Sequence, residues 1–218
     1  MKILMNTGGI AGTNSFLVAD EHSKQAVLID APNDTTAPLL DEAEKNGWDL
    51  TSLWLTHGHF DHMADHAVVK GRFPNARIVV HELDEPKLLD PNELFRMLFV
   101  RPPFTIPPCT PDLKLRGGEK LRVGNLEFEV IHTPGHCAGH VAYYCADEKV
   151  VAGGDLIIAG AVGRSDLPDS NPAQLEASIR RVMQLPGETK LLPGHGDVST
   201  LQQELQTNYF VQEAVQGA

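Results

Sequence analysis

The feature that most constrains this chain is a recurring pattern in which an apolar, strand-like run ends in a short cluster of His, Asp and Gly. The densest cluster is THGHFDHMADH at residues 56–66, directly after the run SLWL. Three shorter clusters follow later runs: TPGH ends at His136, AGGD ends at Asp155, and PGHG contains His195. A glycine beside the polar residue lets the main chain approach whatever that side chain holds. The pattern therefore predicts a polar site at the ends of several strands.

The first cluster favours metal binding over a solvated loop, because a loop needs polarity but has no need of histidine. His57 and His59 are two positions apart with Gly58 between them, which indicates extended or loop geometry rather than the single helix face of an H-E-x-x-H site. Asp61 and His62 are direct neighbours, so their side chains point in different directions. The cluster therefore predicts two metal ions side by side.

Together the four clusters offer five imidazoles and two carboxylates, which is sufficient for two cations if one carboxylate bridges them. Asp65 and His66 come one turn later, and we expect them to be solvated or to support a ligand. We expect the same supporting role of His132 and His140. The candidate metal ligands are His57, His59, Asp61, His62, His136, Asp155 and His195.

Length and charge limit the class of protein. With 218 residues the chain is expected to form one domain over residues 1–218. A formal net charge of −11 argues against nucleic acid and anionic membranes as partners, because both need a basic surface, so we expect a small-molecule substrate. We see no signal peptide at the start, and no apolar run approaches the roughly 20 residues of a spanning helix. A cytoplasmic protein is expected.

The three cysteines, Cys109, Cys137 and Cys145, are odd in number and lack C-x-x-C spacing, which predicts reduced thiols rather than disulfides or a thiolate zinc site. Cys137 adjoins a candidate ligand but has no identified base. It is therefore interpreted as a small turn residue, not a nucleophile. His22 and His81 are expected at the surface.

The apolar runs predict the order of elements. In the first half, short β-like runs alternate with helix-like pieces, the clearest over residues 33–47, as in a layered α/β unit. In the second half, four runs follow one another closely, which favours antiparallel hairpins. A helix over residues 171–186, a strand TKLL and a terminal helix from Ser199 complete the chain. The strand-like runs are NSFLVA, QAVLID, SLWLT, ARIVVH, EKLRV, LEFEVIH, HVAYYC and KVVAGGD.

Residues 88–112 resist assignment, and the five prolines between Arg101 and Asp112 exclude regular structure there. Long loops in compact domains are often functional, although a plain surface excursion is an equal alternative. An anionic substrate approaching this acidic protein needs local positive charge, for which Arg96, Arg101 and Arg164 are the candidates. For Arg164, an ion pair with Asp166 is an equally weighted alternative to binding the substrate.

The order H-x-H-x-D-H, TPGH, GD and PGHG, over nearly the whole chain, resembles the metallo-β-lactamase fold of binuclear hydrolases. GRSDLP and ETKLLPGHG resemble more narrowly the hydroxyacylglutathione hydrolase (glyoxalase II) branch and its short bacterial relatives. The resemblance implies a four-layer αββα sandwich of two mixed β-sheets. It also implies that one metal is held by His57, His59 and His136, that the other is held by Asp61, His62 and His195, and that Asp155 bridges them.

The chain departs from this family in two places. Where the family usually has a pair of glycines after D-H, this chain has Met63, Ala64 and Asp65. The longer glyoxalase II enzymes also carry a C-terminal helical domain that helps to bind glutathione, whereas only residues 196–218 follow His195 here. We therefore expect no separate glutathione-binding helical domain.

These features predict a binuclear metal-dependent hydrolase with two divalent ions, zinc being the first choice and iron or manganese the alternatives. Two cations about 3.5–4 Å apart can share a hydroxide and bring the pKa of bound water near neutrality. Asp61 or Asp155 would orient this nucleophile. A thioester such as S-lactoylglutathione suits the chemistry, because a thiolate leaves without a strong general acid.

Three alternatives use similar ligands. A mononuclear iron persulfide dioxygenase is the first, but the last motif in that branch usually resembles PAHDY, whereas this chain has PGHGD. The second is a lactonase or β-lactamase of the same fold. The third is a non-catalytic protein in which metal only stabilises the fold. Metal analysis, together with assays on a thioester, a lactone and a β-lactam, distinguishes them.

Overall fold

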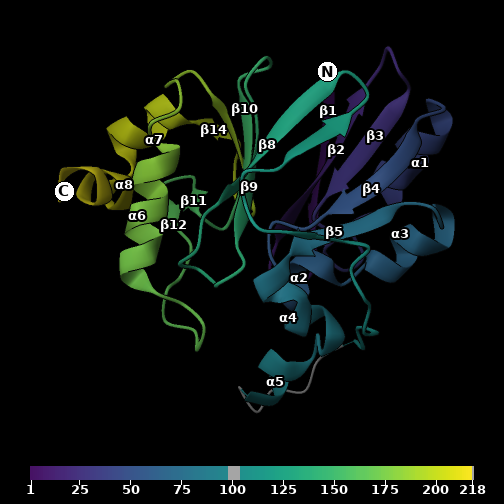
Figure 1. The fold of residues 1–218 in the computed structure, drawn as a ribbon, viewed down its shortest axis with the longest axis horizontal. Coiled ribbons are helices and arrows are strands. Elements are labelled where there is room, and N and C mark those ends of the chain that lie inside the picture. The colour runs from purple at the N-terminus through teal and green to yellow at the C-terminus, as the bar shows by residue number, and fades with distance from the viewer. Residues whose placement is uncertain (98–103, 218) are drawn as a thin grey trace. The chain divides into compact units, whose positions relative to one another are not determined.

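The computed structural model describes residues 1–97 and 104–217 and is drawn in Figure 1. The chain divides into two compact units, the first comprising residues 1–115 and 123–125, the second residues 116–122 and 126–218. Each unit contains a six-stranded mixed sheet flanked by helices. This agrees with the fold class expected from the sequence.

The sheet of the first unit has the strand order β1-β2-β3-β4-β5-β6. Strands β1 to β3 form an antiparallel meander, and β3 to β6 run parallel. The parallel strands β3 and β5 are apolar and buried after their first residue, as expected for strands covered on both faces. The bounds are β1 (Lys2–Gly8), β2 (Thr13–Asp20), β3 (Gln25–Ile29), β4 (Asp49–Trp54), β5 (Arg77–His81) and β6 (Leu113–Leu115).

The parallel pairing determines where polar residues gather in this unit. The carboxyl ends of neighbouring parallel strands meet at one sheet edge, which is where ligands bind in open α/β sheets. Asp30 follows β3, the stretch from Thr56 follows β4, and the short 3₁₀ helix η1 (Glu82–Asp84) follows β5. The side chains of Asp30, Thr56 and Asp84 therefore come to one edge.

Helix α1 (Ala37–Lys45) buries Leu39, Leu40 and Ala43 in the core of the first unit. The sequence placed its start near residue 33, three or four residues too early. Residues 34–36 instead form a loop whose main-chain N–H groups donate to the buried carboxylate of Asp65, at 3.1 to 3.2 Å. Asp65 is thus buried and holds this loop, so it is neither solvated nor in contact with a candidate ligand, the two roles that the sequence predicted. The remaining helices are α2 (Phe60–Met63), α3 (His66–Arg72), α4 (Glu85–Leu89) and α5 (Glu93–Met97).

The segment over residues 88–112 is partly helical, because α4 ends and α5 lies within it. Residues 104–112 have no helix or strand, as their prolines predict. Ile106 is fully buried in the core of the first unit, so this part of the segment is anchored rather than a loose excursion. Arg101 lies outside the described residues. Arg96 forms an ion pair with Asp90.

The sheet of the second unit has the strand order β14-β13-β10-β9-β8-β7. Strands β8, β9 and β10 pair antiparallel as their short connections predicted, and β13 joins β10 in parallel. A separate two-stranded hairpin, β11–β12, follows β10. The bounds are β7 (Lys120–Val123), β8 (Leu126–His132), β9 (Val141–Cys145), β10 (Val150–Gly154), β11 (Ile157–Ile158), β12 (Ala161–Val162), β13 (Lys190–Pro193) and β14 (Ser199–Thr200).

Helix α6 (Pro172–Val182) confirms the predicted helix and its start. The Asn171 side chain accepts a hydrogen bond from the main chain of Gln174, and Leu175, Ile179 and Val182 are buried. The predicted terminal helix is instead a short strand and two helices, α7 (Leu201–Thr207) and α8 (Tyr209–Gln216). The break falls at Asn208, whose extended main chain ends α7 and whose side chain caps α8. Figure 1 shows α6, α7 and α8 grouped together.

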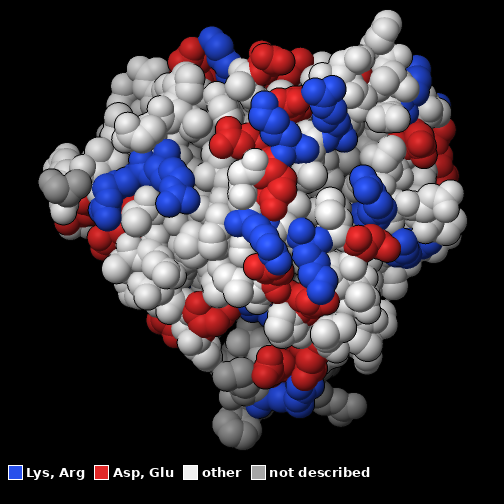
Figure 2. All heavy atoms as spheres, in the orientation of Figure 1, with Lys and Arg blue, Asp and Glu red and all other residues white. Residues whose placement is uncertain are grey.

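None of the helices in the described part of the chain is long and apolar enough to cross a membrane. On the face drawn in Figure 2, acidic and basic side chains are interspersed. Exposed ion pairs are present in the structure, such as Lys149–Glu188, with 2.7 Å between Nζ and Oε1. Isolated exposed pairs of this kind contribute little to stability.

Candidate metal centre

The first unit brings the imidazoles of His57 and His59 together. His57 Nε2 lies 3.0 Å from His59 Nδ1, and both side chains are buried. The alternation around Gly58 in the extended stretch after β4 directs the two rings to one point, as the spacing predicted. Two nitrogens this far apart, each about 2.0–2.1 Å from one ion, subtend roughly 95° at it, which is between octahedral and tetrahedral geometry.

Asp61 and His62 form a second pair in the same unit, on the short helix α2. His62 Nε2 lies 3.5 Å from Asp61 Oδ2, which also accepts a hydrogen bond from Thr13 Oγ1 at 2.9 Å. His62 is fully buried, whereas Asp61 keeps limited exposure. The first unit therefore brings its four candidate ligands close together, since the centroid of the His57 ring lies 4.6 Å from that of His59 and 4.1 Å from that of His62.

Asp30 controls which ring nitrogen of His57 and His62 is available to a metal. Its Oδ2 lies 2.8 Å from His62 Nδ1, and because a carboxylate only accepts, that nitrogen carries the proton. The same oxygen accepts from Thr56 Oγ1 at 2.8 Å, so the hydroxyl is left to accept from His57 Nδ1 at 3.1 Å. Both imidazoles thus keep the lone pair on Nε2.

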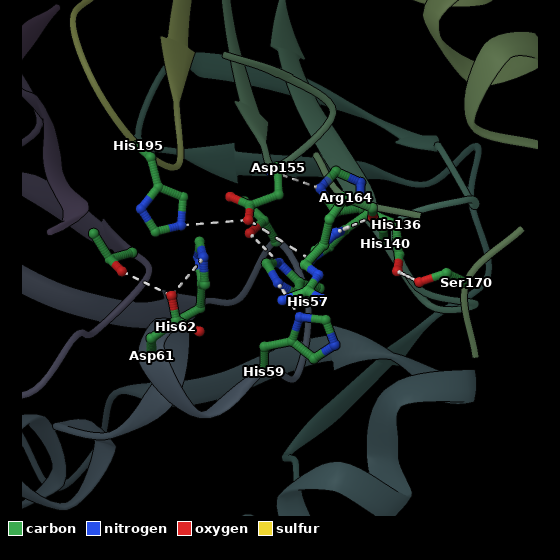
Figure 3. A network of polar contacts seen from close by, with 12 residues as sticks. His57, His59, Asp61, His62, His136, His140, Asp155, Arg164, Ser170 and His195 are labelled. Carbon is green, nitrogen blue, oxygen red and sulfur yellow. Dashed lines mark hydrogen bonds and ion pairs between the residues drawn. The ribbon is translucent and has the colours of Figure 1, made fainter. Parts of the chain in front are cut away.

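The second unit contributes Asp155, at the carboxyl end of β10, between two imidazoles. Asp155 Oδ2 lies 3.6 Å from His136 Nε2 and 3.3 Å from His195 Nε2. Figure 3 shows the His195 ring pointing at this carboxylate. A single carboxylate oxygen within reach of two imidazoles is the arrangement expected of a ligand that bridges two ions.

Hydrogen bonds fix the His136 ring and the main chain at Asp155. His136 Nδ1 donates to the carbonyl oxygen of Arg164 at 2.9 Å, which leaves Nε2 as the ligating nitrogen. The Asp155 main-chain N–H donates to His140 Nε2 at 3.0 Å, and His140 Nδ1 lies 2.7 Å from Thr133 Oγ1. His140 is therefore a buried supporting residue, as the sequence suggested.

Gly135 precedes His136 with a φ of +140°, a conformation that L-residues with a side chain rarely adopt. A Cβ at this position would lie 2.2 Å from the main-chain nitrogen of Leu175. The glycine of the TPGH motif is thus required by the close approach of helix α6. It lets the first turn of that helix pack directly beside the His136 segment.

The polar residues that were not proposed as ligands have other partners. The Arg164 guanidinium donates to both oxygens of Asp166, at 2.6 and 2.9 Å, and stays exposed. Cys137 is fully buried, and His66 Nδ1 donates to the Met63 carbonyl. His81 was expected at the surface and is instead buried, because its side chain caps η1 by accepting from Leu83 N.

A buried carboxylate on α7, Glu204, links the end of the chain to the β11–β12 hairpin. It accepts hydrogen bonds from Gly160 N at 3.0 Å, from Asn208 Nδ2 at 2.9 Å and from Ser199 Oγ. Asn208 Nδ2 also donates to the carbonyl oxygens of Ile158 and Ala161. We call this contact set the C-terminal clasp. It holds the β11–β12 hairpin, which lies between Asp155 and Arg164 in the sequence.

Sequence reasoning missed four supporting residues: Thr13, Asp30, Asp84 and Glu204. Asp30 had a visible signal, because it ends the apolar run QAVLID just as the candidate ligands end theirs. Thr13, Asp84 and Glu204 gave no comparable local signal. Their partners lie far away in the chain or across a helix.

The donor set suits a transition metal. Imidazole nitrogens and carboxylate oxygens bind zinc, iron and manganese, and the hydrogen bonds above leave Nε2 of His57, His62 and His136 as the ligating atom. All seven predicted ligands also belong to groups of His, Asp and Cys that could hold a metal ion. The residues present therefore fit a metal site.

Comparison with known proteins places this geometry in context. The family described as the Metallo-beta-lactamase superfamily matches residues 8–195. A protein of Aquifex aeolicus is 36% identical over 210 residues, which are 96% of each chain. Hydroxyacylglutathione hydrolase GloC of Haemophilus influenzae is 30% identical over 208 residues, covering 91% of this chain and 92% of that protein.

Among relatives named hydroxyacylglutathione hydrolase, some are longer than this chain. The one from Ruegeria pomeroyi is 29% identical over 181 residues, and the match spans 83% of this chain but 61% of that protein.

Two solved structures are similar over nearly their whole length. The B3 metallo-β-lactamase BLEG-1 has a TM-score of 0.86 at 31% identity, over 96% of this chain and 99% of that chain. TTHA1623, solved in a di-iron-bound form, has a TM-score of 0.82 at 36% identity, over 95% and 99%. One similar chain is thus named for β-lactam chemistry and the other is known with two iron ions.

Proposed function

Because this chain belongs to the metallo-β-lactamase superfamily, we propose that it is a metal-dependent hydrolase of thioesters that resemble S-lactoylglutathione. The observation that carries the proposal is the position of Asp155 Oδ2 between the imidazoles of His136 and His195. It suits a carboxylate that bridges two ions and so favours a binuclear hydrolase over a mononuclear iron enzyme. The name of the GloC relative supports the thioester class.

The proposed roles of the ligands follow the family resemblance. His57 and His59, with His136, would hold one ion, and Asp61 and His62, with His195, the other. Asp155 would belong to both. When bound, the ions would supply Lewis acidity and a water nucleophile active near neutral pH.

The chain's own residues prepare this site for binding and orientation. Asp30 holds the Nδ1 proton of His62 and, through Thr56, that of His57, so that both rings present Nε2. Arg164 does the same for His136 through its carbonyl oxygen. Preorganised ligands of this kind lose little free energy to reorganisation when charge develops at the reacting carbonyl.

We further propose that the Arg164 side chain binds an anionic group of the substrate, remote from the reacting carbonyl. Its exposed pair with Asp166 is no obstacle, because solvent screens such pairs and they contribute little free energy. Arg164→Ala should raise KM more than it lowers kcat, since it removes binding without disturbing the carbonyl that supports His136. Arg122→Ala, which removes an equally exposed and paired arginine, is the matched control.

The test combines metal analysis with three substrates. Purified protein should contain two transition-metal ions per chain and should hydrolyse S-lactoylglutathione with a higher kcat/KM than a lactone or a β-lactam. The likeness to BLEG-1 makes the β-lactam arm necessary. A single iron per chain with oxygen uptake on glutathione persulfide would replace this proposal with the dioxygenase. Equal KM values in Arg164→Ala and Arg122→Ala would refute the role of Arg164.

A further inference from the structure

A partly buried ion pair lies against the His57–Gly58–His59 stretch of the first unit. Asp84, the last residue of η1, has no exposed side-chain surface, and its Oδ1 lies 2.6 Å from Nζ of Lys87 on α4. Burying two charges costs free energy even when they are paired, and apolar replacements are often equally stable. General stability therefore gives no sufficient reason for a charged pair at this place.

The second oxygen of Asp84 contacts the main chain between the two histidines. Asp84 Oδ2 accepts a hydrogen bond from Gly58 N at 2.6 Å. This N–H belongs to the residue that separates His57 from His59, so its position sets the directions in which both rings leave the chain. The bond is short and its acceptor is charged, which places it among the stronger class of hydrogen bonds.

Packing against Gly58 is equally close. A Cβ at this position would lie 2.9 Å from Lys87 Cβ, 3.1 Å from the Asp84 carbonyl oxygen and 3.3 Å from Leu88 Cδ1. Gly58 therefore packs directly against the junction of η1 and α4. Asp84 contacts it through the hydrogen bond to its N–H, and Lys87 contacts it through Cβ.

The charge state of Asp84 agrees with this role. Burial opposes ionisation, but Lys87 and the Gly58 N–H outweigh it, so the pKa of Asp84 lies below its ordinary value. The group stays a carboxylate, which accepts from Gly58 and cannot donate.

We propose that Asp84 and Lys87 are positioning residues for the metal half-site of His57 and His59. Asp84 fixes the Gly58 main chain so that His57 Nε2 and His59 Nδ1 meet 3.0 Å apart, and Lys87 keeps Asp84 charged and in place. The stretch is then held on both sides, by Asp30 and Thr56 before Gly58 and by Asp84 after it. The inference rests on the proposed metal centre and adds to it the residues that orient one ligand pair.

The experiment measures Co²⁺ binding to metal-free protein, by competition with a chelator and by the visible d–d absorption, beside thermal unfolding of the metal-free form. Asp84→Ala should weaken Co²⁺ binding by about 10–100-fold and change the absorption. The double variant with Asp84→Ala and Lys87→Met also removes the partly buried ammonium that Asp84→Ala leaves without its carboxylate, so it should regain stability, but its Co²⁺ affinity should stay low.

A conservative variant supplies the rescue. Asp84→Asn combined with Lys87→Met keeps an oxygen acceptor for Gly58 N–H without either charge, so its Co²⁺ affinity should lie within a few-fold of wild type. Asp20→Asn is the matched control, because Asp20 is also a buried carboxylate that accepts main-chain N–H groups in this unit, from His22 and Asn125. It should lower stability and leave Co²⁺ affinity unchanged.

The outcomes are separable. Wild-type affinity and absorption in the variant with Asp84→Ala and Lys87→Met would overturn the positioning role while the metal centre stands. Weakened Co²⁺ binding in the Asp20→Asn control would also overturn the positioning role, because a general loss of stability would then be enough to weaken Co²⁺ binding. A wild-type protein that binds no Co²⁺ would refute the metal centre and this inference with it.

Discussion

Asp30→Asn should remove metal from the protein while leaving it folded. Asparagine has the shape of aspartate and tolerates the left-handed φ of +59° at this position, so the main chain need not move. Aspartate accepts three hydrogen bonds here: Oδ1 from Thr56 N, and Oδ2 from Thr56 Oγ1 and His62 Nδ1. The amide cannot replace all three, because one of its two ends donates.

The magnitude follows from the two possible orientations of the amide. With its oxygen toward His62, its NH₂ faces the Thr56 N–H, and one buried donor loses its acceptor, at a cost of about 1–3 kcal/mol in unfolding free energy. With its NH₂ toward His62, Nδ1 must accept, and the proton moves to Nε2, where a metal should bind. Loss of such support typically weakens metal binding by about 10–100-fold. Since Thr56 links Asp30 to His57 as well, both ligand pairs should be affected.

The assay is Zn²⁺ competition with a chromophoric chelator, together with urea unfolding of the metal-free protein. Asp30→Asn should bind both equivalents of Zn²⁺ at least about tenfold more weakly than wild type. Asp20→Asn should bind them as tightly as wild type. The reasoning is refuted if Asp30→Asn binds two Zn²⁺ as tightly as wild type.

Three further outcomes are expected. Asp155→Ala should lower metal content and abolish turnover, whereas Cys137→Ala, measured by the same metal analysis and kinetics, should keep most activity; an inactive Cys137→Ala with full metal would require a covalent mechanism. Burial raises the pKa of Cys109 to about 11 from 9.0, so its thiolate at pH 8 is about a hundredfold scarcer than that of an ordinary cysteine. A thiol reagent should therefore label Cys109 slowly in the native protein and fast in the unfolded protein, and rapid labelling of the native protein would contradict the burial. The hydrogen bond from the Asn125 main chain, with others, holds the pKa of Asp20 far below its ordinary value. The stabilisation that Asp20 contributes is therefore present above about pH 4 and declines as the pH falls further. Urea midpoints should fall more steeply between pH 7 and pH 3 for wild type than for Asp20→Asn, and parallel curves would argue against this contribution.

Much of this fold could be predicted because its strands are local signals. Runs such as ARIVVH and KVVAGGD are apolar, β-branched and bounded by turn residues, and they became β5 and β10. The start of α1 could not be read in the same way. It depends on the Asp65 carboxylate, which takes the N–H groups of residues 34–36 from 29 to 31 positions away.

The candidate ligands could be predicted for a similar reason, since they lie in short clusters that contain glycine and follow apolar runs. The residues that orient them could not. The pairing of Thr13 with Asp61 spans 48 positions, and that of Asp84 with Gly58 spans 26. Such contacts arise from sheet topology, and one sequence carries no period or spacing that marks them.

The C-terminal clasp has a consequence for how the protein is made. Gly160 N and the carbonyl oxygens of Ile158 and Ala161 find their partners in Glu204 and Asn208, which the ribosome adds 44 to 50 residues later. Until those residues leave the exit tunnel, the hairpin that follows Asp155 lacks these bonds. In a nascent chain that has not yet exposed Asn208, the segment between Asp155 and Arg164 therefore lacks the bonds that hold it in the folded protein.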